Sequence, residues 1–134
     1  MSFTILRIMS GVFMLCFHGW PKLMRYADLS QRFSDPLGIG SEMSLILVIF
    51  AEVFCSILLI TGTAIRFATI PLMITMFVAS FIVHADDPIR KIELPLMYLG
   101  IYLVLFIGGA GKYALRFRRI ASKHPISKWL FDIT

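Results

Sequence analysis

Four long apolar runs constrain this chain more than any other feature of its sequence. A membrane-spanning helix needs about 20 consecutive apolar residues to cross about 30 Å of hydrocarbon. Four runs are close to that length, at about residues 3–24, 43–63, 66–84 and 93–109. They are continuous rather than alternating, which excludes barrel strands and leaves helices as the structure that satisfies the backbone in lipid. We therefore predict an all-α fold, an integral membrane four-helix bundle.

The charged residues are too few to cover a water-soluble domain. They make up 16% of the 134 residues, against about 25% in a typical soluble domain. We expect one transmembrane domain over residues 1–111, followed by a basic tail over 112–134. Cys16 and Cys55 lie within apolar runs and show no metal-binding spacing, so no metal site is predicted.

The positive charges gather at the ends of the apolar runs, which favours membrane topology over nucleic-acid binding as their explanation. Four spans place both termini on the same side. Eight Lys and Arg residues fall on that side against five on the other, so the positive-inside rule predicts cytoplasmic termini. The eight are Arg7, Arg66, Lys112, Arg116, Arg118, Arg119, Lys123 and Lys128.

Apolar residues recur among the basic ones of the tail, for example Leu115, Phe117 and Ile120. This pattern predicts an amphipathic segment that lies on anionic lipids of the cytoplasmic leaflet. A docking arm for a soluble partner is the alternative interpretation.

One face of the first span is polar. Its members are separated by 4, 7, 4 and 3 residues, so they share a stripe on a helix that should face the bundle rather than lipid. They are Arg7, Gly11, His18, Lys22 and Arg25.

Glu52 lies in the middle of the second span. A charged and unpaired carboxylate there is costly, so Glu52 is either protonated or paired with a cation such as Lys22, His18 or an arginine. Glu52 and His18 are the candidate catalytic residues, as proton-handling groups of a pocket that opens to the non-cytoplasmic side. The candidate ligand-binding residues are Lys22, His84, Glu93, Arg7 and Arg66.

Simpler interpretations stay open for several of these residues. Arg7, Arg66 and Lys22 lie near span ends and can extend to the membrane surface without binding anything. His84 and Glu93 can lie in water at the outer ends of their spans.

Three stretches resemble the DoxX family of small bacterial membrane proteins: "RIMSGVFMLCFHGWPKL", "AEVFCSILLITGTAIRFATIPL" and "GGAGKYAL". Together the motifs extend over most of residues 5–115. The ending departs from the family pattern at Ala114 and Arg116, where a basic residue replaces an acidic one. The positions that match the family are Arg7, Gly11, His18, Gly19, Lys22, Glu52, Leu59, Gly62, Arg66, Gly108, Gly109 and Gly111.

This resemblance implies a multi-pass protein of the bacterial inner membrane with a redox-associated role, linked to quinones or to thiol and oxidative stress. We expect a subunit of a membrane oxidoreductase that binds a quinone-like small apolar molecule, with no cofactor assigned. A non-enzymatic scaffold or assembly factor that recruits a soluble redox enzyme is the alternative, and a small proton-coupled transporter is a weaker one. Gly100, Gly108 and Gly111 allow close helix approach within the chain or in a homo-oligomer.

Overall fold

The computed structural model describes residues 2–109, and every regular element among them is a helix. Four helical rods in this range are long and apolar enough to cross a membrane, which confirms the predicted all-α fold and its four spans. The rods run over Ser2–Met24, Ser41–Thr61, Ile65–Val83 and Ile89–Gly108. Gly111 and the basic tail expected over residues 112–134 lie outside the described residues.

Three of the four rods contain a π-helical turn. The first consists of α1 (Ser2–Met14), the turn η1 (Leu15–Gly19) and α2 (Trp20–Met24). The second consists of α4 (Ser41–Ile49), the turn η2 (Phe50–Cys55) and α5 (Ser56–Thr61). The third consists of α6 (Ile65–Val78) and the turn η3 (Ala79–Val83). The fourth is the uninterrupted α7 (Ile89–Gly108), and a short helix, α3 (Tyr26–Leu29), follows the first rod.

Pro21 explains the first π-helical turn. It has no backbone N–H, so the carbonyl of Phe17 loses the donor that an α-helix would give it. The chain widens just before this point, and the N–H of Trp20 bonds to the carbonyl of Leu15, five residues back. The sequence did not predict π-helical turns in three of the rods.

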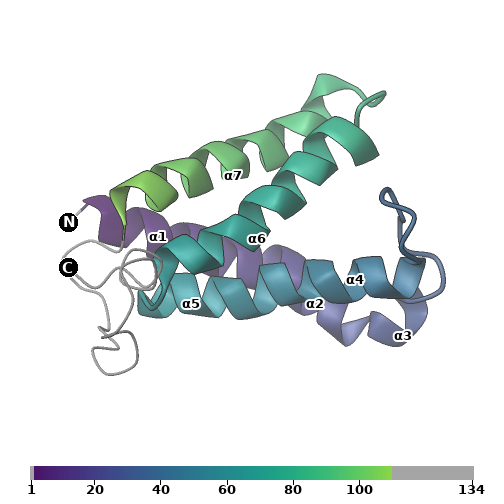
Figure 1. Ribbon diagram of the computed structural model, residues 1–134, viewed down its shortest axis with the longest axis horizontal. Coiled ribbons are helices and arrows are strands. Elements are labelled where there is room, and N and C mark those ends of the chain that lie inside the picture. The colour runs from purple at the N-terminus through teal and green to yellow at the C-terminus, as the bar shows by residue number, and fades with distance from the viewer. Residues whose placement is uncertain (1, 110–134) are drawn as a thin grey trace.

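The rods are arranged as an antiparallel bundle (Figure 1), with a longer connection over residues 25–40 and short ones over 62–64 and 84–88. The start of α1, the α5–α6 turn and the end of α7 lie at one end, and α3 lies at the other. Gly62 makes the tight α5–α6 turn possible, because its φ of 80° is in the left-handed region that favours glycine. Towards the α3 end, α6 diverges from α4 in Figure 1.

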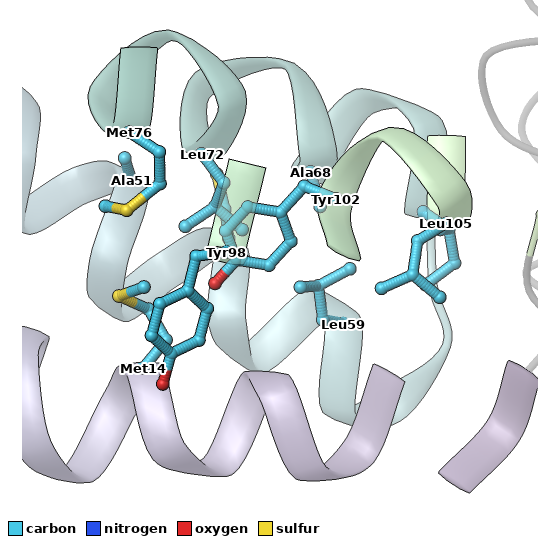
Figure 2. Packing of buried hydrophobic residues seen from close by; sticks show 11 residues of the cluster. Met14, Ala51, Leu59, Ala68, Leu72, Met76, Tyr98, Tyr102 and Leu105 are labelled. Atoms are coloured by element: carbon cyan, nitrogen blue, oxygen red, sulfur yellow. The ribbon is translucent and has the colours of Figure 1, made fainter. Parts of the chain in front are cut away.

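The packed core lies between the rods. Met14, Leu59 and Leu105 are fully buried, and Tyr102 stacks on Tyr98 with ring centroids 5.8 Å apart (Figure 2). The outer surface is apolar as well, with side chains such as Phe17 and Ile107 about 70% exposed. This surface suits lipid rather than water, as a membrane bundle requires.

Candidate functional site

Lys22 and Glu52 form an ion pair inside the bundle. The Nζ atom of Lys22 donates to both carboxylate oxygens of Glu52, at 2.7 Å from Oε1 and 2.5 Å from Oε2. The Glu52 side chain is only 3% exposed and that of Lys22 is 25% exposed. Of the cations considered for Glu52, the structure thus pairs it with Lys22, which does not extend to the membrane surface.

Gly19 allows the first rod to approach Glu52 closely. A Cβ atom at Gly19 would lie 2.7 Å from the carbonyl oxygen of Glu52 and 2.9 Å from Val53, so no larger residue fits without movement. Gly19 belongs to η1 and Glu52 to η2, which places two π-helical turns against each other at the ion pair. Such turns occur frequently at functional sites.

A cavity of about 330 Å³ opens beside the ion pair, and we call it the polar cavity because six of its lining residues are His, Lys, Arg or Glu. His18 lines it, and its ring meets the ring of Tyr98 edge-on with centroids 5.8 Å apart. The structure therefore brings four of the predicted site residues to one cavity. The lining residues are His18, Lys22, Glu52, Met76, Ala79, His84, Arg90, Lys91, Leu94, Pro95 and Tyr98.

A second cavity of about 320 Å³ adjoins the same ion pair and lies between the second and third rods. It shares Lys22, Glu52 and His84 with the first cavity, but most of its walls are apolar. Those walls come from α4, α6, η3 and the loop that precedes α4. We call it the apolar slot, and its hydrophobic residues are Phe33, Pro36, Leu37, Ile39, Leu47, Val48, Ile74, Met76, Val78, Ala79 and Val83.

His84 is fixed by a small charged cluster at the α3 end of the bundle. Its Nδ1 atom lies 2.7 Å from a carboxylate oxygen of Asp87, and Lys91 donates to the other oxygen at 3.1 Å. The hydrogen bond with His84, followed by that from Lys91, lowers the pKa of the Asp87 carboxyl. His84 thus lines both cavities from the end of the third rod, where it is about one third exposed.

The two predicted arginines lie at the opposite end, away from these cavities. Arg7 is 1% exposed and donates from Nη1 to the carbonyls of Leu59 and Ile60, both at 2.7 Å. Arg66 donates from Nε to the carbonyl of Phe106 at 3.1 Å. Each arginine thus stabilises the C-terminal end of another helix, where carbonyls lack helical partners and positive charge is favourable. Arg7 is buried rather than extended to the membrane surface.

Glu93 is not brought to the site. The fourth rod begins at Ile89 rather than at Glu93, so this carboxylate lies in the second turn of α7, where it is exposed and lines neither cavity. Sequence reasoning instead missed Tyr98, Asp87 and Arg90. The only signal for Tyr98 was its place on a helix that begins near His84.

Polar hydroxyls continue from the ion pair into the core. Ser56, one turn after Glu52, and Tyr102 are fully buried, and their hydroxyls have no hydrogen-bond partner among residues 2–109. No group of three or more His, Cys, Asp or Glu residues suited to a metal ion occurs in the same part of the chain. The side chains at the polar cavity that can exchange protons or stabilise charge include Lys22, Glu52 and His18.

Together the four apolar rods and the enclosed ion pair define a multi-pass α-helical membrane protein with a polar site inside its bundle. The DoxX family model matches residues 2–85, so the chain belongs to the DoxX family, as its motifs indicated. An uncharacterized protein of Haemophilus influenzae (strain Rd) is 31% identical over 110 residues, which cover 78% of this chain and 72% of the relative. No solved structure matches the chain.

Proposed function

We propose that this protein is a redox-associated subunit of the bacterial inner membrane that binds a quinone-like molecule beside Lys22 and Glu52. The observation that supports the proposal is the ion pair itself, which lines both the polar cavity and the apolar slot. A quinone has an apolar ring, which suits apolar walls, and carbonyl oxygens, which need polar partners. Cavities of about 320 and 330 Å³ are also within the usual size range of small-ligand sites.

The redox step accounts for the residue types. A quinone becomes a quinol when it takes up two electrons and two protons. A partner oxidoreductase supplies the electrons from its own reduced substrate, and His18 and Glu52 pass the protons from the polar cavity to the two ring oxygens. The Lys22 ammonium balances negative charge on those oxygens during the transfer. Arg90 and Lys91 line the same cavity and keep it accessible to water and protons from outside.

Replacing the carboxyl group tests this role. Glu52→Gln keeps the shape of the side chain but removes its charge and its proton-accepting oxygen. We expect the variant in nanodiscs to lose binding of a short-chain ubiquinone analogue, measured by equilibrium titration. Glu42→Gln is the matched control, because Glu42 is exposed and bonds only to Tyr26 among the described contacts. Unchanged binding by the Glu52 variant would contradict the proposal.

The second proposed function is that of a scaffold that recruits a soluble redox enzyme through the basic tail. Its support is the sequence of residues 112–134, where basic and apolar residues mix. Truncation after Lys112 would then remove the partner from membrane pull-downs, while Glu52→Gln would leave it bound. The opposite result would favour the quinone-binding role.

The topology belongs to the same proposal. With eight basic residues on the side of the termini, both termini lie in the cytoplasm and the two cavities open towards the periplasm. A membrane-impermeant thiol reagent added to intact cells tests this. We expect it to label a cysteine introduced at Asp86 and not one introduced at Thr63.

A further inference from the structure

The walls of the apolar slot offer no polar partner to a ligand near its α4 and α6 sides. Ser44 donates to Asp35 at 2.9 Å, and Thr75 donates back to the carbonyl of Pro71 at 2.9 Å. The other polar residues that line the slot are Ser34 of the loop before α4, His84 at the end of the third rod, and Lys22 and Glu52, which bind each other. The part of the slot between α4 and α6 therefore suits a hydrocarbon chain. The part next to Lys22 and Glu52, which we call its floor, is polar.

The loop before α4 covers the slot on the water side. Phe33, Leu37 and Ile39 from this loop line the slot. Asp35 fixes the loop to the start of α4, because its carboxylate accepts hydrogen bonds from the N–H groups of Ile39 and Gly40 at 3.0 and 2.8 Å.

The flank of the slot faces the bilayer instead. Leu47 of α4 and Ile74 of α6 line the slot and are 50% and 57% exposed, and both belong to membrane-spanning rods. In Figure 1, α6 diverges from α4 at the end of the bundle where these residues lie. Access to Glu52 through the slot thus leads sideways, from the hydrocarbon of the membrane.

We infer that the apolar slot holds the prenyl tail of a membrane quinone, which enters between the second and third rods with its ring at Lys22 and Glu52. The inference rests on the proposed function and adds the entry route and the place of the tail. Continuity supports it, because the slot and the polar cavity share the ion pair. The tail extends past Leu47 and Ile74 into the bilayer.

The charge at the floor favours a quinone over a phospholipid. Lys22 and Glu52 neutralise each other, so the floor suits an uncharged ring, whereas a phosphate would meet the Glu52 carboxylate. The pair also lies along the spans rather than at the surface where phosphates reside, since Glu52 is the twelfth residue of the rod that begins at Ser41.

Val48→Trp tests the slot, because Val48 lines the slot but not the polar cavity. Ile57→Trp is the matched control, since Ile57 is 45% exposed on the same rod and lines neither cavity. Binding of a long-tailed quinone and of a tailless ring analogue is measured in nanodiscs. We expect Val48→Trp to lose the long-tailed quinone but retain the tailless analogue, and Ile57→Trp to bind both.

Full binding of the long-tailed quinone by a folded Val48→Trp variant would overturn the slot assignment and leave the proposed function standing. Failure of the native protein to bind either molecule would instead overturn the proposed function.

Photolabelling of the native protein covers the case in which the tryptophan variant does not fold. A quinone with a diazirine at its tail should label peptides containing Leu47 and Ile74, and an excess of native long-tailed quinone should suppress the labelling. A phospholipid with a diazirine on its acyl chain should label the same peptides without this suppression. The inference would be contradicted if the quinone probe labelled the same peptides as the phospholipid probe and an excess of native long-tailed quinone did not suppress its labelling.

Discussion

The backbone of Gly19 lies directly against the backbone carbonyl of Glu52. A Cβ atom at Gly19 would approach the carbonyl oxygen to 2.7 Å and the carbonyl carbon to 2.8 Å. This contact sets the separation of the first two rods at the site. Since Lys22 follows Gly19 by three residues, about one helical turn, the same contact positions its ammonium group over the Glu52 carboxylate.

Gly19→Ala should therefore destabilise the protein. The added methyl group meets backbone rather than a flexible side chain, so the rods must separate and the ion pair must lengthen. We expect a loss of about 1–3 kcal/mol in the free energy of unfolding, measured by denaturation in detergent. Gly100→Ala is the control, because nothing lies within 4 Å of a Cβ atom there and alanine favours the helix. Equal effects of the two variants would contradict this packing.

Lys22→Met and Glu52→Leu should each destabilise the bundle strongly, and the double variant should recover part of the loss. Removal of one partner of a buried pair leaves the other charge uncompensated or forces it to neutralise by gaining or losing a proton, at a cost of about 3–5 kcal/mol, whereas removal of both leaves none. Denaturation of the four proteins gives the coupling energy.

The exposed pair of Arg32 and Asp28 is the control for this cycle. Their side chains are 63% and 64% exposed, so their coupling should be about 0–1 kcal/mol. A coupling of Lys22 with Glu52 as small as this would argue against a buried ion pair.

Arg7→Ala should weaken the end of the bundle that holds the start of α1 and the α5–α6 turn, without affecting the cavities. The change removes two charged hydrogen bonds to the carbonyls of Leu59 and Ile60, each worth about 1.5–3 kcal/mol. Thermal unfolding should show a clear loss for Arg7→Ala and little change for Arg25→Ala, whose side chain is 61% exposed. If Arg7 instead takes part in ligand binding, quinone titrations will show a loss in excess of that explained by stability.

Acid should release the loop that covers the apolar slot. The N–H of Gly40, followed by the Ser44 hydroxyl and the N–H of Ile39, lowers the pKa of the Asp35 carboxyl. A lowered pKa means that the bonds are fully present above the usual value of about 3.9 and are lost as the pH falls through the lower folded value. The Ile39 and Gly40 amides should therefore lose their protection against hydrogen exchange only when the pH falls through the lower folded pKa of Asp35.

The variant Asp35→Asn should show the faster exchange already at neutral pH. Asp86→Asn, in the other loop at the same end, is its control. Equal protection of Ile39 and Gly40 in native protein and Asp35→Asn would contradict the account of the loop.

The sequence predicted the four spans because a long apolar run has one stable outcome in lipid. It also predicted that Glu52 is either protonated or paired with a cation, since an unpaired carboxylate is costly there. The choice of Lys22 required the close approach of the rods at Gly19. That distance depends on the packing of two elements, which a single sequence does not record.

Other parts of the site have no sequence signal at all. A π-helical turn shifts one hydrogen-bond register, and apart from Pro21 no residue type marks it. Arg7 and Arg66 bind backbone carbonyls, which every residue possesses, so their partners could not be identified from side chains. Glu93 was placed at a helix start because the apolar run begins there, but α7 begins a turn earlier with Ile89.

The protonation state of Glu52 tests the central claim most directly. Infrared difference spectra between native protein and Glu52→Gln, in lipid at neutral pH, isolate the vibrations of this one side chain. We predict the bands of an ionised carboxylate in native protein and their replacement by the band of a protonated carboxyl group in Lys22→Met. Carboxylate bands that persist unchanged in Lys22→Met, or a protonated Glu52 in native protein, would contradict the ion pair on which the site depends.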